Sequence, residues 1–481
     1  MYFNLMKKIN RRNFLKNTSL TAASALSTSL INNSCNEVHI PSSEGKYMGD
    51  FAAPKIKNIR VAFIGVGYRG SGHLAYFGGI PDTEVVAVCD LYQDNVENSI
   101  NRLKHKFSNK KFKKISKYWG EENKWKLMLE KTKPDLVFIS TNWNNHAPMA
   151  IESMKKGAHV FVEVPIATNL EDIWKIVNTS EKKQKHCMML ENVNYFRAEM
   201  MFLNMIRQNL IGELQHGEAA YIHDLREQMK HENRGTGSWR TLHYAKSSGN
   251  LYPTHGLGPI AQYMNLARTE DNFKSIVSYS SPAMGRKLYT EKNYPKDHKW
   301  NKLDYKNGDL NTSILKTKLG RTILVQWDET SPRPYSRINL IQGTKGILTG
   351  HDINNNLYKS NNPIRIALDD GIDGLSKSSH EWVSGERLEK IIEKYEHPFW
   401  KRLNKTAKGS DHGGSDGIML SRIAECIHKG IPLDQNVYEG CFWSSVTPLS
   451  AQSIKENGTP QIFPDFTRGN WKTTKPLEII S

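Results

Sequence analysis

A glycine-rich turn near the start of the chain constrains its fold more than any other feature. The sequence Gly65-Val66-Gly67-Tyr68-Arg69-Gly70 follows the β-branched apolar run Ile59–Ile64 and precedes a segment compatible with a helix. Asp90 ends the next apolar run, Glu84–Cys89, 20 positions beyond Gly70. This order of strand, G-x-G-x-x-G turn, helix and acidic residue predicts a dinucleotide-binding unit. The structural alternative is a simple glycine turn in which Asp90 caps a helix.

The same residues indicate which dinucleotide would bind. Glycines allow backbone N–H groups to approach a pyrophosphate at the positive end of the following helix. A carboxylate at Asp90 can accept hydrogen bonds from both ribose hydroxyls, and it would repel a 2′-phosphate. The sequence therefore predicts NAD as the cofactor in preference to NADP.

Further apolar runs extend the first unit. Asp135–Ile139 and His159–Val162 are also short and rich in β-branched residues, and helix-compatible segments separate them. Near-continuous apolar strands of this kind are typical of a parallel sheet covered on both faces. We therefore expect an α/β fold whose N-terminal Rossmann domain spans residues 58–187.

The pattern changes after this domain. Alternation appears in segments such as Thr322–Val325 and Ile338–Ile341, with Pro- and Gly-containing loops between them, while Lys359–Lys390 is polar and irregular. We expect residues 188–481 to form an α+β domain with a largely antiparallel open sheet.

The composition restricts the function. With 38% apolar and 24% charged residues, and no apolar run of membrane-spanning length, the chain has the balance of a soluble protein of two domains. The formal net charge is +17, but the lysines are scattered in pairs, so we do not expect nucleic-acid binding. The five cysteines contain no C-x-x-C pair and indicate neither a disulfide framework nor a metal site.

The first 35 residues are typical of a targeting segment. Arg11-Arg12 precede Phe14-Leu15-Lys16 and a Ser/Thr/Ala-rich run, which resembles a twin-arginine export signal; a frayed basic terminus is the alternative. A linker would cover residues 36–57. We expect an exported protein, periplasmic or at the cell surface, that contacts a membrane only if Cys35 is lipidated. A homo-oligomer is compatible with the sequence.

Two more polar segments lie at predicted strand ends. Ser140–His146 follows one strand, and Glu163-Val164-Pro165 follows another. The carboxyl edge of a parallel sheet is where a Rossmann fold binds its ligands, although helix capping and a simple turn are the structural alternatives.

These features together resemble the glucose–fructose oxidoreductase and inositol dehydrogenase superfamily. Members usually carry E-K-P where this chain has Glu163-Val164-Pro165, and the lysine serves at the active site. Valine can neither relay a proton nor bind a hydroxyl, so the substitution argues against ordinary sugar-alcohol dehydrogenation.

The rest of the chain is similar to glycoside hydrolase family 109, the NAD-dependent α-N-acetylgalactosaminidases, from about Asn58 almost to the C-terminus. The shared stretches are Leu190–Tyr195, Ile211–Gly217, Tyr221–Arg226, Trp239-Arg240, Leu251–Pro259, Arg333–Tyr335, His412–Asp416 and Trp443–Ser450. One departure is Asn145, since the family tends to have an aromatic residue before the histidine.

The resemblance implies roles for individual residues. It implies NAD contacts from Gly65, Gly67, Tyr68, Arg69, Gly70, Asp90, Trp143, Asn144, Asn145, His146, Glu163, Val164 and Asn192. It implies sugar contacts from Tyr221, Arg240, Tyr252, Pro253, Thr254, His255 and Tyr335. Aromatic rings beside an arginine and a histidine are what a sugar pocket requires.

Each of these residues also has an ordinary structural explanation. Arg240 could stack on Trp239 at the surface, and His255 could be a loop histidine with satisfied hydrogen bonds. The glycines after His412 could simply begin a helix capped by Ser415 or Asp416.

The resemblance also implies a mechanism. Oxidation of the sugar at C3 acidifies the C2 proton, the C1 aglycone is eliminated, water adds, and the hydride returns to C3. His255 is the candidate base for the C3 hydroxyl, and Tyr195 is a weaker candidate for the C2 proton. The substrate would be a glycan or glycoconjugate with terminal N-acetylgalactosamine. A sugar dehydrogenase and a non-catalytic NAD- or sugar-sensing protein are the alternatives.

Overall fold

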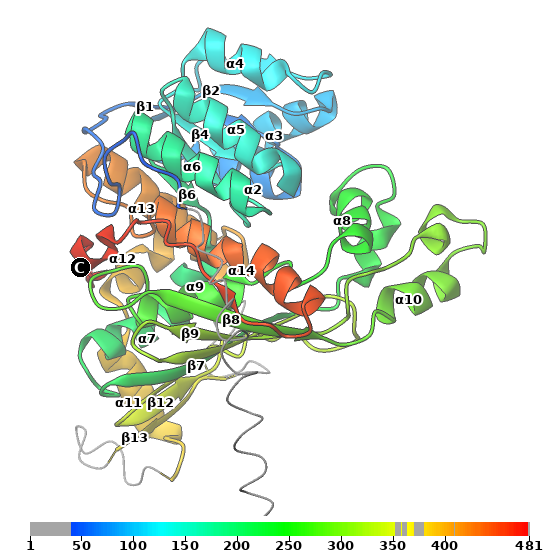
Figure 1. Ribbon diagram of the computed structural model, residues 1–481. Helices are drawn as coiled ribbons and strands as arrows, with labels where there is room; N and C mark the ends of the chain where they lie inside the picture. Colours follow the sequence, from blue (N-terminus) through cyan, green and yellow to red (C-terminus); the bar gives the residue numbers. More distant parts are fainter. Residues whose placement is uncertain (1–39, 352–356, 358–362, 370–379, 408, 480–481) are drawn as a thin grey trace, which may run out of the picture. The chain divides into compact units, whose positions relative to one another are not determined.

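The computed structural model describes residues 40–351, 357, 363–369, 380–407 and 409–479 (Figure 1). The predicted export signal, with Arg11, Arg12 and Cys35, lies outside the described residues, as do the first residues of the predicted linker. Within the described ranges, no helix has the length and apolar character needed to cross a bilayer.

The first layer is a six-stranded parallel sheet with the strand order β3-β2-β1-β4-β5-β6. Its strands are β1 (Ile59–Ile64), β2 (Thr83–Cys89), β3 (Ser116–Tyr118), β4 (Leu136–Ile139), β5 (His159–Val162) and β6 (Cys187–Met189). The order reverses between β1 and β4, and this switch point is where a Rossmann fold binds its cofactor. The predicted Rossmann domain is therefore confirmed.

Helices cover this sheet because its strands are apolar on both faces. They are α2 (Tyr68–Phe77), α3 (Gln93–Lys106), α4 (Lys124–Thr132), α5 (Trp143–Lys155) and α6 (Leu170–Lys183). All four residues of β4 and all four of β5 are buried, which explains the unbroken apolar runs in the sequence.

The second layer is an eight-stranded sheet with the order β13-β12-β11-β7-β10-β9-β8-β14. Its strands are β7 (Leu214–Ile222), β8 (Phe273–Ser280), β9 (Asn311–Thr317), β10 (Thr322–Asp328), β11 (Leu340–Gly343), β12 (Gly346–Thr349), β13 (Arg365–Leu368) and β14 (Gln461–Ile462). The central pair β7 and β10 is parallel, and the other pairs are antiparallel. The predicted largely antiparallel sheet is therefore confirmed.

Part of the polar region Lys359–Lys390 is more regular than the sequence suggests. Arg365–Leu368 forms strand β13, and Ile366 and Leu368 of that strand are buried. Two apolar residues at alternate positions are enough for an edge strand once β12 supplies its hydrogen-bonding partner.

The remaining helices lie against these sheets. They are α7 (Arg197–Arg207), α8 (Thr236–Lys246), α9 (Thr254–Tyr263), α10 (Gly285–Asn293), α11 (Gly385–Tyr395), α12 (Pro398–Ala407), α13 (Ser415–Lys429) and α14 (Val437–Lys455). Short 3-10 turns include η1 (Asn192–Tyr195) and η2 (Arg226–Lys230).

Helix α13 belongs to the Rossmann core although it comes from the C-terminal part of the chain. Its residues Ile418, Met419 and Ile423 share one buried apolar cluster with Val61 and Phe63 of β1. The segment before β1 is tied to the C-terminal region as well, because Tyr47 stacks on Tyr438 at 4.8 Å between ring centroids. The first sheet is thus completed by residues from both ends of the described chain.

Candidate active site

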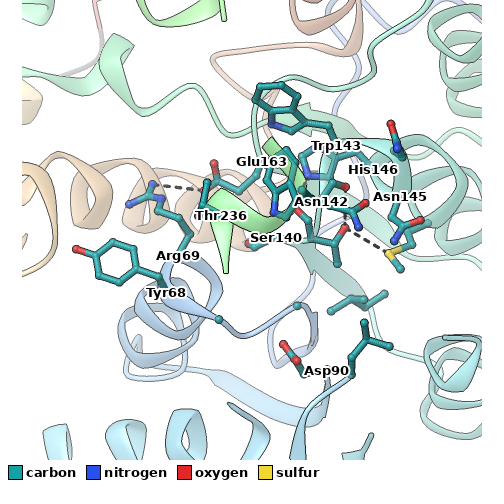
Figure 2. A pocket seen from close by; sticks show the side chains of 18 of the residues that line it. Tyr68, Arg69, Asp90, Ser140, Asn142, Trp143, Asn145, His146, Glu163 and Thr236 are labelled. Carbon is teal, nitrogen blue, oxygen red and sulfur yellow. Dashed lines mark hydrogen bonds and ion pairs between the residues drawn. The ribbon is translucent and has the colours of Figure 1, made fainter. Parts of the chain in front are cut away.

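One cavity of about 1440 Å³ runs along the carboxyl edge of the parallel sheet. Loops after β1, β2, β4 and β5 line it on one side, and residues from β7, α8 and α9 line it on the other. Figure 2 shows Asp90 at one end of this cavity and Trp143 with Glu163 toward the other end. The predicted cofactor residues are therefore gathered in one place.

The three glycines of the turn have different functions. Gly65 has a φ of +79°, and a Cβ there would lie 2.6 Å from the carbonyl oxygen of Ser140. A Cβ at Gly70 would lie 1.9 Å from the carbonyl oxygen of Gly65, so this glycine lets α2 pack closely against the turn. At Gly67 a Cβ would meet nothing within 4 Å. The space beside the Gly67 backbone is therefore open where a pyrophosphate must approach, and the turn fits NAD.

Asp90 directly follows β2 and contacts the same glycine turn. Its Oδ2 accepts a hydrogen bond from the Val66 backbone N–H at 2.8 Å. Its Oδ1 accepts from the Tyr92 backbone N–H and from Asn95 Nδ2, both at 3.0 Å. These bonds hold the carboxylate at the cavity wall, where its remaining lone pairs can accept ribose hydroxyls.

A charged network lies beneath the opposite end of the cavity. Arg69 pairs with Glu163 at 3.4 Å (Figure 2). Arg69 also pairs with Asp416 at 2.8 Å, and His73 Nε2 lies 2.6 Å from Glu163. Burial would raise the pKa of Glu163, but Arg69 and His73 hold that pKa at about 2. Asp416 also accepts from Asn192 Nδ2 at 2.7 Å. Glu163 and Asp416 are thus permanent anions that fix Arg69 and Asn192 in position.

The sequence did not identify Asp416 as part of this network. It lies in the first turn of α13, where the sequence allows Ser415 or Asp416 to cap the helix. In the structure the carboxylate instead binds Arg69, Asn192 and His412, which itself lines the cavity. Such a contact joins residues more than 200 positions apart, so local pattern gives no signal for it.

The predicted segment Trp143–His146 begins helix α5 at the cavity. Trp143 is buried, and its ring lies 4.9 Å from Trp239 in an edge-on arrangement. His146 is buried with Nδ1 2.7 Å from the Pro165 carbonyl oxygen, and burial lowers its pKa. Asn144 and Asn145 are exposed residues of the cavity lining.

Aromatic rings form the wall of the cavity beside Trp143. The ring centroids of Tyr221 and Tyr252 are 4.9 Å apart, and His255 lies 5.1 Å from Tyr221 and 4.8 Å from Tyr252. The Arg240 guanidinium lies 5.2 Å from the Tyr252 ring and 5.0 Å from the Trp143 ring. Burial raises the pKa of both tyrosines, so their hydroxyls stay protonated and can donate to a polar ligand.

Glu191 is a buried partner that the sequence analysis did not single out. Its Oε1 lies 2.6 Å from His255 Nδ1, and the carboxylate side chain is fully buried. Because a carboxylate only accepts, it places the proton of a neutral His255 ring on Nδ1 and leaves Nε2 as the proton acceptor. The residue lies inside the shared stretch Leu190–Tyr195, which was the available signal.

Glu329 is a buried carboxylate partner of Arg240, as Glu191 is of His255. The fully buried Glu329 lies 3.8 Å from Arg240 Nη1 and accepts a hydrogen bond from Tyr244. Burial alone would lower the pKa of Arg240, but Tyr244 and Glu329 raise it above its ordinary value. Arg240 is therefore a fixed cation in the aromatic wall and not a surface stacking residue.

Four of the residues predicted to contact the cofactor or the sugar do not line the cavity directly. The Tyr335 ring lies behind Tyr221, at 6.1 Å between centroids. Pro253 is the N-cap of helix α9 and Thr254 is its first residue; Tyr252 precedes them and His255 follows them. Gly70 packs beneath the glycine turn.

Tyr195 is placed away from the cavity, and its predicted role as a base is not supported. Its hydroxyl donates to Asp434 Oδ2 at 3.3 Å, and its ring is buried in the apolar core. Burial and the nearby Asp434 raise its pKa well above the ordinary value, which is the wrong direction for a base. The side chain leaves η1 on the side of α13, a direction that the sequence does not reveal.

Comparison with known proteins agrees with this geometry. A family model for the oxidoreductase family with an NAD-binding Rossmann fold matches residues 59–191, and the glycosyl hydrolase 109 C-terminal domain matches residues 195–473. A protein of Akkermansia muciniphila named glycosyl hydrolase family 109 protein 1 is 55% identical over 436 residues, which cover 90% of this chain and 87% of the relative.

The chain belongs to glycosyl hydrolase family 109.

This family 109 protein is thus a glycosidase that binds NAD in its Rossmann domain. A protein of Shewanella oneidensis named alpha-N-acetylgalactosaminidase is 46% identical to it over 477 residues, covering 99% of this chain and the whole relative. Among solved structures, levoglucosan dehydrogenase in complex with NADH and levoglucosan aligns with a TM-score of 0.63 and 16% identity. That alignment covers 85% of this chain and all of the other, and it shows a shared fold.

Proposed function

We propose that this protein removes terminal α-N-acetylgalactosamine from glycans through transient oxidation at C3, elimination of the aglycone and addition of water. The observation that carries the proposal is the arrangement of the cavity, which joins a dinucleotide turn to an aromatic, arginine-containing wall with a carboxylate-bound histidine. The relative named alpha-N-acetylgalactosaminidase supports the choice of sugar.

The wall around Tyr221, Tyr252 and Arg240 suits a sugar that carries an acetamido group. Aromatic faces pack against the C–H faces of a pyranose ring, while phenol hydroxyls and a guanidinium donate to its oxygens. Because Arg240 is fixed by Glu329, it can bind a carbonyl or hydroxyl oxygen without losing side-chain freedom at that moment.

His255 is the residue that takes a proton from the sugar. Its Nδ1–H is held by Glu191, so Nε2 faces the reaction as the base. When the ring accepts a proton, the buried carboxylate 2.6 Å away stabilises the imidazolium. NAD, when bound, supplies a hydride acceptor at the beginning of the cycle and a hydride donor at its end.

Glu163 and Glu191 do not suit the roles of the two carboxylates in an ordinary glycosidase. Such an enzyme needs one carboxyl group that is protonated at working pH as a general acid. Glu163, the carboxylate of the lining nearest Arg69 and His73, has its pKa held at about 2 and is already paired with both. Glu191 is fully buried behind His255. The ionised, paired state of Glu163 and the burial of Glu191 favour a route in which oxidation of the sugar activates the glycosidic bond.

Val164 distinguishes the proposal from a sugar dehydrogenase. Its side chain is 3% exposed in the cavity wall, beside Glu163, and carries no group that could relay a proton. A dehydrogenase of the same fold would release its reduced cofactor at each turnover, whereas the proposed cycle leaves the cofactor as it began.

The decisive experiment uses nitrophenyl α-N-acetylgalactosaminide deuterated at C2, in ordinary water. We expect nitrophenol release without steady growth of NADH absorbance, and exchange of the C2 deuterium for solvent hydrogen in the product. Enzyme stripped of NAD should lose its activity and regain it when NAD is added. Full deuterium retention by an enzyme that stays active without NAD would instead indicate direct displacement, and steady NADH production would indicate a dehydrogenase.

We also propose export of the folded protein to the periplasm or cell surface. The twin-arginine-like sequence Arg11-Arg12-Asn13-Phe14-Leu15-Lys16 supports this, since a route for folded proteins would let the enzyme acquire NAD in the cytosol first. Its substrate outside the cytoplasm would be a glycan or glycoconjugate with terminal N-acetylgalactosamine.

A further inference from the structure

A short segment from the sugar-binding side of the cavity reaches across to the ribose end of the cofactor site. The segment runs from His231 to Thr236, between η2 and α8, and we call it the bridging segment. His231, Arg234, Gly235 and Thr236 line the same cavity as Asp90. Arg234 of this segment lies 2.9 Å from Asp94, so the segment reaches the end of the cavity where Asp90 would bind the adenosine ribose.

Arg234 connects this segment to the Rossmann domain. Its Nη1 lies 2.9 Å from Asp94 Oδ2, and its Nη2 donates to Asn95 Oδ1. The guanidinium also lies 4.0 Å from the centroid of the Tyr92 ring. One side chain thus makes an ion pair, a hydrogen bond and a cation–π contact with residues directly after β2.

These contacts surround the carboxylate that would bind the ribose. Asn95, which accepts from Arg234, donates through Nδ2 to Asp90 Oδ1 at 3.0 Å. The backbone N–H of Tyr92 donates to the same oxygen at 3.0 Å. The bond to Arg234 also lowers the pKa of Asp94 and keeps it ionised.

The bridging segment is anchored at its base. Glu232 Oε2 lies 3.0 Å from His298 Nε2, and its carbonyl oxygen accepts from Lys299 Nζ at 2.8 Å. Before the segment, the Met229 carbonyl oxygen accepts from Trp300 Nε1 at 3.0 Å. Because these contacts fix the start of the bridging segment to the sugar-binding domain, the contacts of Arg234 span the cavity between the two domains.

We infer that Arg234 retains NAD by closing the ribose end of the cofactor site. The inference rests on the proposed function, because a cofactor that is restored in each cycle needs no exit between turnovers. Release of NAD then requires the guanidinium to leave Tyr92, Asp94 and Asn95 together. The side chains of Arg234 and Asp94 are 40% and 58% exposed, so salt should weaken the closure.

The test measures how quickly NADH leaves the purified full-length protein, without any sugar substrate. The protein is loaded with NADH and mixed with excess NAD, and the loss of bound NADH fluorescence gives the dissociation rate. We expect Arg234→Ala to raise this rate about 5- to 30-fold, the sum of one exposed ion pair and one cation–π contact. The rate for Arg234→Ala should also depend less on NaCl concentration than the wild-type rate.

Control variants separate retention from a general change of charge. Lys230→Ala removes an exposed cation that pairs only within its own turn, with Glu227, and should leave the NADH dissociation rate unchanged. Asp94→Ala removes the partner from the other domain and should also raise the rate. The double variant Arg234→Ala/Asp94→Ala should be no faster than Arg234→Ala alone, because Asp94 contributes to the closure through its ion pair with Arg234.

An unchanged rate in Arg234→Ala, or fully additive effects in the double variant, would overturn the inference. If Arg234→Ala does not fold, Asp94→Ala and Arg234→Lys carry the test. Asp94→Ala leaves Arg234 unchanged, and Arg234→Lys keeps a positive charge at that position. A protein that lacks glycosidase activity but shows the expected dissociation rates would refute the proposed function and leave the role of Arg234 intact.

Discussion

Glu191 Oε1 lies 2.6 Å from His255 Nδ1, and the carboxylate that makes this contact has no exposed surface. A hydrogen bond of this kind orients the imidazole and determines which nitrogen can act as a base. It also makes formation of the imidazolium easier inside a site from which water is excluded. Glu191 is therefore a positioning residue for His255.

Removing either member of this pair should slow catalysis to different extents. His255→Ala should lower kcat by about 100-fold or more, because it removes the base itself. Glu191→Gln keeps an oxygen acceptor but removes the charge, and we expect kcat to fall about 10-fold with KM little changed. The acidic limb of the kcat profile should move to lower pH in Glu191→Gln. A profile identical to that of the wild type would show that Glu191 is only structural.

Asp90 should control the choice between NAD and NADP. Asp90→Ala removes the ribose acceptor and the negative charge that repels a 2′-phosphate, so NAD should bind more weakly and NADP relatively better. Calorimetric titration of the NAD-free protein with both cofactors measures the two affinities. A wild-type protein that already prefers NADP would contradict the role assigned to Asp90.

The export signal can be tested with a conservative change. Replacing Arg11 and Arg12 by lysine keeps the positive charge but removes the twin arginines, and the protein should then remain in the cytoplasm. Fractionation of cells followed by immunoblotting reports its location. Export at the wild-type level in the double-lysine variant would argue against the twin-arginine route.

Buried histidines should make the folded protein sensitive to mild acid. Burial and the nearby Lys185 lower the pKa of His159 from 6.5 to about 3. The unfolded chain therefore binds a proton between about pH 6.5 and pH 3 that the folded protein does not. Stability contributed by neutral His159 is present above this window and is lost as the pH falls through it.

The variant His159→Gln should show this loss less strongly. The imidazole Nδ1 accepts from the His186 backbone N–H at 3.0 Å, and a glutamine oxygen can serve the same purpose. Urea unfolding at several pH values between 7 and 4 gives the comparison. We expect the free energy of unfolding to fall less steeply in the variant, by up to about 1.4 kcal/mol per pH unit. Parallel curves for the two proteins would exclude His159 as the group responsible.

The sequence predicted the parts of the fold that depend on short segments. Strands Ile59–Ile64 and His159–Val162 were predicted with the bounds that the structure shows, because unbroken apolar runs between helices are a local signal. The glycine turn and most of the predicted cofactor residues gather at one cavity for a geometric reason. Carboxyl ends of parallel strands must meet at one edge of the sheet.

Contacts between distant residues could not be predicted in this way. Glu191 and His255 are 64 positions apart, and Asn192 and Asp416 are 224 positions apart. For Tyr195 the sequence predicted a role that the structure does not support. Its position in a shared stretch gave no information on the direction of its side chain. Only the packing of η1 against α13 determines that its hydroxyl reaches Asp434.

The contribution of α13 to the first apolar core has a consequence for biosynthesis. Ile418 belongs to the same buried cluster as Val61 and Phe63, but the ribosome adds it about 350 residues later. At a translation rate of roughly 5 to 20 residues per second, one face of the nascent Rossmann sheet stays uncovered for on the order of 20 to 70 s, until α13 has been synthesised. Arg69 and Asn192 precede their partner Asp416 by 347 and 224 residues, so both are synthesised well before it. The complete cofactor site therefore exists only after translation has nearly finished, and a chain truncated before α13 would expose an apolar sheet to chaperones and proteases.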